Sequence, residues 1–259
     1  MTRALGWIAF SLLLFPARSP SQGSPAPTPE TREAQYVALQ ADLFDAQTLA
    51  ALPDPVSRIA RMLREIRSQF PAVANLRIPA QMTARTSVII GLQPALRQQL
   101  DSRCVGWSGY AQARSATLEI PEMDAVTQKF GGAYEITCRS RGISLGSYVV
   151  VNFPRLLHVP SLVRLYRAAA GVTSAENNHV VLGGVMPVSA KQQDGQWRVT
   201  FGLGAGDCPA GCTYREYHHF LVAPDSTIQY LGPERQGQLP SVVPQDAPEE
   251  ESEAEPLPQ

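Results

Sequence analysis

The sequence predicts a mixed α+β protein, and three observations indicate this class. Between residues 86 and 177, apolar runs of strand and helix character follow one another in the order β-α-β-β-α-β. Residues 196–231 contain three aromatic-rich runs with the strand period of two, and residues 56–70 carry apolar side chains at helical spacing. We therefore expect an α+β core, preceded by helices and extended by a C-terminal antiparallel meander.

The N-terminal residues have the pattern of a secretory signal, which we assign to residues 1–23. Arg3 precedes the apolar run Leu5–Phe15, which ends at Pro16. At about a dozen residues, this run is shorter than the ~20 residues that span a bilayer. The mature chain is thus expected to be secreted or periplasmic and to have no membrane span.

A helical N-terminal segment is expected over residues 34–80, after a disordered linker over residues 24–33. A first helix is predicted within residues 32–50. A second helix follows, with an apolar stripe formed by Val56, Ile59, Leu63, Ile66 and Phe70, and it should end before Pro71. The arginines at positions 58, 61, 64 and 67 lie largely off this stripe.

The predicted α+β domain covers residues 81–232. Its first six elements are the strand 86–92, the helix 123–130, the strands 133–138 and 147–153, the helix 161–170 and the strand 172–177. This order is the ferredoxin-like arrangement.

The C-terminal meander is predicted from the runs 197–201, 214–222 and 228–231. The segment Gly202–Cys212 separates the first two runs, and its glycines predict a tight corner in place of a continued strand. Residues 233–259 are expected to be a disordered acidic tail, rich in proline and glutamate.

Composition and charge limit the function classes. Hydrophobic residues make up 44% of the chain, and the formal net charge is −1. Residues 236–259 hold six acids and no base, so the rest of the mature chain carries a charge of about +3. This small surplus argues against a dedicated nucleic-acid-binding protein.

The four cysteines allow three disulfide pairings, and the sequence leaves the choice open. The pairing Cys104–Cys138 with Cys208–Cys212 is favoured because it joins the two cysteines that share a turn. An alternative places zinc between Cys208, Cys212, His218 and His219, since thiolate and imidazole are standard ligands. Adjacent histidines on a strand point to opposite faces, so only three of these four groups could converge, and the disulfides are preferred.

No catalytic constellation or cofactor motif is found in a suitable setting. Gly142–Gly146 matches the hydrolase pattern G-x-S-x-G, but a strand follows Ser144 where that motif requires a helix. The enzyme alternative is a hydrolase that uses Ser144 or Asp207 with His218 or His219. The favoured class is a non-enzymatic binding module without cofactor.

Two resemblances bear on this class. The segment Leu162–Val172, followed by Ser174–Asn177, resembles the second helix and last strand of subtilisin-type propeptides and related proteinase inhibitors. This resemblance implies a ferredoxin-like fold and a protein partner such as a protease. The Gly-Asp-Cys-Pro-Ala-Gly-Cys meander is similar to that of a family of uncharacterised secreted bacterial proteins, and this resemblance implies no activity. The expected partner is a protein, either a protease or an envelope protein.

Overall fold

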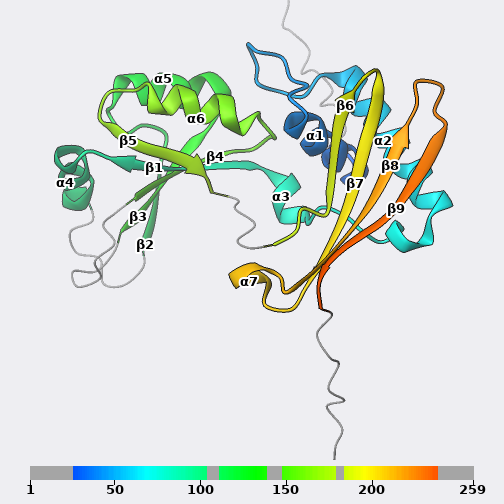
Figure 1. Cartoon of the computed structure of the whole chain (residues 1–259). Helices are drawn as coiled ribbons and strands as arrows, with labels where there is room; N and C mark the ends of the chain where they lie inside the picture. The colour runs from blue at the N-terminus through cyan, green and yellow to red at the C-terminus, as the bar shows by residue number, and fades with distance from the viewer. Residues whose placement is uncertain (1–25, 104–110, 139–147, 179–183, 239–259) are drawn as a thin grey trace, which may run out of the picture.

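The protein is a mixed α+β structure with two antiparallel sheets (Figure 1). The computed structural model describes residues 26–103, 111–138, 148–178 and 184–238. One sheet has five strands in the order β2-β3-β4-β1-β5, and the other has four in the order β6-β7-β8-β9. None of the described helices combines the length and the apolar composition that a membrane span requires.

The first helix differs from its predicted range because capping, not composition, sets its ends. Helix α1 spans Pro29–Gln40 and begins inside the predicted linker. Thr28 Oγ1 accepts a hydrogen bond from the backbone N–H of Thr31, and Pro29 occupies the first helical position, where its missing N–H costs nothing. The helix ends ten residues before the predicted end, and Asp42, two residues later, has a φ of 59°.

Helix α2 spans Pro53–Gln69 and buries the predicted apolar stripe up to Ile66. The prolines at 53 and 55 lie in its first turn, where no N–H donor is needed. Arg67, one of the arginines largely off this stripe, nevertheless has a buried side chain. Two short helical segments follow, η1 at Pro71–Val73 and α3 at Ala80–Ala84.

The five-stranded sheet consists of β1 (Thr86–Leu92), β2 (Ala111–Ser115), β3 (Ala133–Cys138), β4 (Tyr148–Phe153) and β5 (Val172–Asn177). Three helices accompany it: α4 (Pro94–Arg103), α5 (Pro121–Phe130) and α6 (Val159–Arg167). Helices α5 and α6 lie side by side over one face of the sheet (Figure 1). Neither β2 nor α4 was predicted, since β2 has no apolar run and α4 has no clear apolar stripe.

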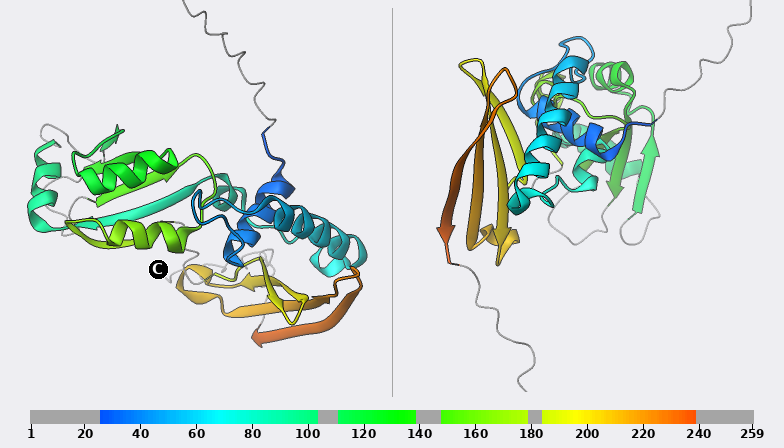
Figure 2. Two further views of the ribbon diagram at one scale, coloured as in Figure 1. Left: turned by 90° about the horizontal axis from the view of Figure 1, so that it is seen from above. Right: turned by 90° about the vertical axis from the view of Figure 1, so that its right-hand side faces the viewer.

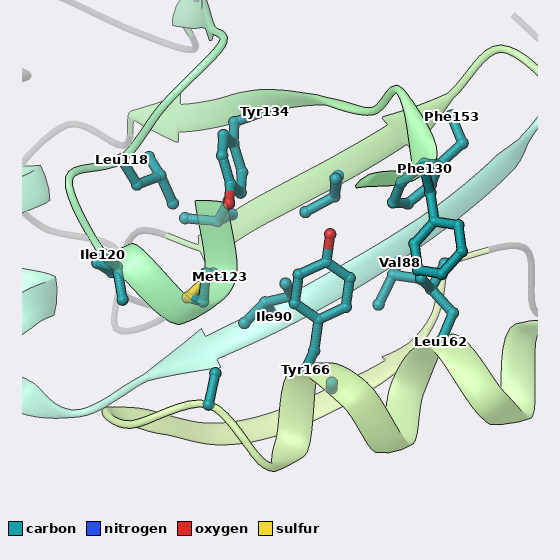
Figure 3. Packing of buried hydrophobic residues seen from close by; sticks show 14 of the residues in the cluster. Val88, Ile90, Leu118, Ile120, Met123, Phe130, Tyr134, Phe153, Leu162 and Tyr166 are labelled. Carbon is teal, nitrogen blue, oxygen red and sulfur yellow. The ribbon is translucent and has the colours of Figure 1, made fainter. Parts of the chain in front are cut away.

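The core of this sheet is apolar apart from a small group of hydroxyls. Tyr134 from β3 and Tyr166 from α6 extend into it among the labelled apolar side chains (Figure 3). Thr127 Oγ1 lies 2.6 Å from the hydroxyl of Tyr134 and 2.8 Å from that of Tyr166. These contacts join α5, α6 and β3, because each buried hydroxyl requires a partner.

The four-stranded sheet consists of β6 (Val188–Gln193), β7 (Gln196–Ala205), β8 (Tyr214–Val222) and β9 (Ile228–Gly237). The prediction that Gly202 and Gly204 end the first strand is wrong, because β7 continues to Ala205. A Cβ atom on Gly204 would lie 2.4 Å from Cys212 Sγ, and one on Gly202 would lie 2.6 Å from the carbonyl oxygen of Met186. The glycines therefore allow neighbouring chain to pack directly on the strand. Strand β9 extends beyond residue 232 into the segment assigned to the tail.

The N-terminal helices pack on the C-terminal sheet. Side chains from α1, α2, β6, β7 and β8 form one apolar cluster, and those of the five-stranded sheet with α5 and α6 form another. We call residues 86–177 the central body, and the helices α1–α3 with strands β6–β9 the terminal body (Figure 2). The central body is thus inserted between two halves of the terminal body, whereas the sequence suggested one domain over residues 81–232.

Candidate functional site: the cavity between the two bodies

A cavity of about 830 Å³ lies where the two bodies meet. The terminal body contributes residues of α1, α3 and β6 to its wall, and the central body contributes the start of β1, the β4–α6 connection, α6 and the end of β5. Its apolar lining residues include Leu39, Met82, Leu156, Leu157, Val163 and Met186. A largely apolar cavity with a few polar groups at a junction of this kind is typical of ligand sites.

His158 forms part of the cavity wall and connects the central body to the α1–α2 loop. Its Nε2 lies 2.9 Å from a carboxylate oxygen of Asp42, and its ring stacks on Phe44 with 3.8 Å between centroids. Its backbone N–H donates to the carbonyl oxygen of Leu49. Burial lowers the pKa of His158 below its usual value, although Asp42 partly offsets this effect. The contacts of His158 therefore hold the loop against the start of α6.

A hydrogen-bonded series runs from Asp42 through His158 to Ser161, and its residue types are those of an acid–base triad. The second ring nitrogen of His158, Nδ1, lies 2.9 Å from Ser161 Oγ. However, Ser161 does not line the cavity, and its oxygen also accepts a hydrogen bond from Arg164. The Asp42 side chain is 79% exposed, whereas a triad carboxylate is buried. This hydrogen-bonded series therefore holds the α1–α2 loop to the N-terminus of α6.

Two charged side chains at the cavity lack partners. Within the part of the chain that the structure describes, the side chains of Arg85, at the end of α3, and Glu176, on β5, make no hydrogen bond and no ion pair. By contrast, Arg167 Nε donates to the carbonyl oxygen of Ala175. Arg85 and Glu176 are exposed, and they give the cavity one available charge of each sign.

The histidines of β8 belong to two separate polar groups. His218 is buried on the face that packs toward the helices, and its ring nitrogens contact Tyr230 Oη at 2.8 Å and a Glu216 carboxylate oxygen at 3.3 Å. His219 lies on the opposite face, with Thr200 and Glu234 as its partners. Desolvation lowers the pKa of His218, and a hydrogen bond from Tyr214 is the main cause of the lowered pKa of Glu216.

The cysteine turn contains a disulfide. Cys208 and Cys212 are bonded to each other at the ends of α7, a single helical turn over Cys208–Gly211. Because the sulfurs are joined, neither is available as a thiolate ligand for zinc. Asp207 precedes the turn, and the partners of His218 and His219 within the described residues do not include it. Cys104, Ser144 and the side chain of Cys138 lie outside the described residues.

Within residues 26–103, 111–138, 148–178 and 184–238, no group of three or more histidine, cysteine, aspartate or glutamate side chains could hold a metal ion. Comparison of the chain with protein-family models, with curated proteins and with solved structures finds no match.

The sequence does not indicate the cavity. It gives no sign that His158, Arg85 and Glu176 belong to one site. The three residues lie far apart in the chain and carry no shared motif. The cavity depends on how the two bodies meet, and no local pattern reports that arrangement.

Proposed function

We propose that the protein is a secreted or periplasmic, non-enzymatic binding module that holds its ligand in the cavity between the two bodies. The observation that supports this most is the cavity itself, which has about 830 Å³ of space, an apolar lining and two charged groups that have no partner among the described residues. The N-terminal apolar run supports export.

The experiment compares two tryptophan substitutions on one face of β6. Ser189 lines the cavity, whereas Lys191, two residues along the same strand, does not. We expect a thermal-shift screen of amphipathic small molecules and peptides to find compounds that stabilise the wild-type protein and Lys191→Trp, but not Ser189→Trp. Stabilisation that is the same in all three proteins, or none at all, would refute a ligand site in this cavity.

We further propose that the central body has the ferredoxin-like arrangement and that a protease is one partner, as the resemblance to propeptides implies. Without the edge strand β2, the sheet order is β3-β4-β1-β5 with every pair antiparallel. This order, with α5 and α6 on one face, supports a β-α-β-β-α-β core. Assaying subtilisin-type proteases in the presence of the purified protein tests this partner. Protease activity that is unchanged at a high molar excess of the protein would contradict the proposal of a protease partner.

A further inference from the structure

We infer that the ligand of the cavity is a peptide segment with apolar side chains, flanked by one acidic and one basic group. This inference rests on the proposed function of the cavity. It follows from the volume of the cavity, the side chains of its apolar part, and the two charges at its wall.

The volume and apolar lining suit a few side chains of variable shape. A cavity of about 830 Å³ lies within the range of about 300–1,000 Å³ for ligand pockets, so it accommodates a segment and not a folded domain. Two methionines line it, Met82 from α3 and Met186 from the residues just before β6. The flexible thioether of methionine adapts to different apolar partners, as on surfaces that bind many peptides.

The neutral polar groups of the wall match a peptide backbone. Tyr36, Gln40 and Ser189 provide hydroxyl and amide groups that can donate and accept hydrogen bonds. The amide of Gln40 makes a weak contact, 3.7 Å, with the sulfur of Met186, and it also hydrogen-bonds to the Tyr36 hydroxyl. The N–H and C=O groups of an entering peptide would find partners here, whereas a purely hydrocarbon ligand would form no hydrogen bond with these side chains.

The two charges without partners select for a ligand that carries both signs. Arg85 suits a carboxylate, and Glu176 suits an ammonium or guanidinium group. A simple fatty acid would use Arg85 alone and would place its chain near the unpaired Glu176. A peptide with an acidic and a basic group pairs with both.

The test uses a pool of fluorescein-labelled hexapeptides with central Leu and Met residues, one Glu and one Lys, and measures binding by fluorescence polarisation. We expect Arg85→Glu to weaken binding of this pool about tenfold, and a second pool with Lys in place of Glu to restore it. Glu176→Lys should likewise weaken binding of the first pool, and a pool with two Glu residues should restore binding to this variant. The matched control is Arg58→Glu, an exposed arginine of α2 that does not line this cavity.

Four results overturn the inference. Equal weakening by Arg58→Glu and Arg85→Glu would show general charge attraction. Loss of affinity without rescue by the altered pools would show that the charges do not contact the peptide. If dodecanoate binds, no peptide pool binds, and Ser189→Trp abolishes the dodecanoate binding, the peptide is rejected but the proposed function of the cavity stands. If Ser189→Trp changes the binding of no probe, both the peptide and the proposed function are rejected.

Discussion

Arg67 and Glu33 illustrate how one buried pair joins the first two helices. The guanidinium donates to both Glu33 carboxylate oxygens at 2.7 and 2.8 Å and to the carbonyl oxygen of Leu76 at 2.6 Å. Glu33 also accepts from the backbone N–H of Ile78. Both side chains are buried, so each charge depends on the other for compensation.

Removing one member of this pair should therefore be costly. We expect Arg67→Met to lower the free energy of unfolding by about 3–5 kcal/mol, because it leaves Glu33 buried without its counter-charge. Arg64→Met removes an exposed arginine of the same helix and should change it by less than about 0.5 kcal/mol. Urea denaturation measures both, and similar values for the two variants would contradict this account.

His158 should make stability depend on pH. Its pKa is lowered in the folded protein, chiefly by desolvation, so the unfolded chain binds more protons as the pH falls below about 6.5. The stabilisation is present above that pH and is lost as the pH decreases. We expect His158→Gln to reduce the loss of unfolding free energy between pH 7.5 and 5.5, relative to the wild-type protein.

Asp42→Asn provides the opposing variant. Asp42 raises the pKa of His158 and so limits the shift. Its removal should increase the loss of stability between pH 7.5 and 5.5, as measured by denaturation at each pH. A smaller loss in this variant would show that Asp42 does not act on His158 in this way.

At the scale of elements, the glycines of β7 are a sensitive position. A methyl group at position 204 would overlap the sulfur of Cys212, which belongs to the disulfide turn. We expect Gly204→Ala to lower the free energy of unfolding by about 1–3 kcal/mol because of this overlap. Leu203→Ala alters the adjacent exposed side chain and is the control for general effects on the strand. Equal melting temperatures for the two variants would contradict a close contact at Gly204.

Elements with strong local signals could be predicted from the sequence. The strands 86–92, 133–138 and 172–177 match β1, β3 and β5, because their apolar or β-branched runs end at clear boundaries. The strands β2 and β6 were missed, since both are sheet edges with few apolar residues. The cavity could not be predicted at all, because Arg85, His158 and Glu176 meet there through tertiary packing alone.

At the scale of the whole molecule, we expect the end of β9 to be the C-terminal boundary of the part of the chain that stabilises the fold. Strand β9 reaches Gly237, and Arg235 donates to Glu216 across the β8–β9 pair. We expect deletion of residues 239–259 to leave the melting temperature unchanged, because their composition of acids and prolines does not favour a buried core.

Deletion of residues 233–259 is the informative comparison. It removes Glu234 and Arg235 together with half of β9, and it should lower the melting temperature by several degrees. Calorimetry of the two truncated proteins measures the difference. Equal melting temperatures would mean that the second half of β9 does not stabilise the sheet.

The insertion of the central body affects the order in which the chain can fold. Helices α1 and α2 leave the ribosome about 120 residues or more before the strands that bury them, so their apolar faces must wait for the C-terminal half. The central body is continuous in sequence, and its first and last strands are neighbours, with Val88 opposite Asn177. Once this body has folded, the two halves of the terminal body emerge from adjacent points. Folding of the central body has then already paid the entropy cost of closing the long loop between these two halves. Their assembly is therefore comparable to closing a short connection.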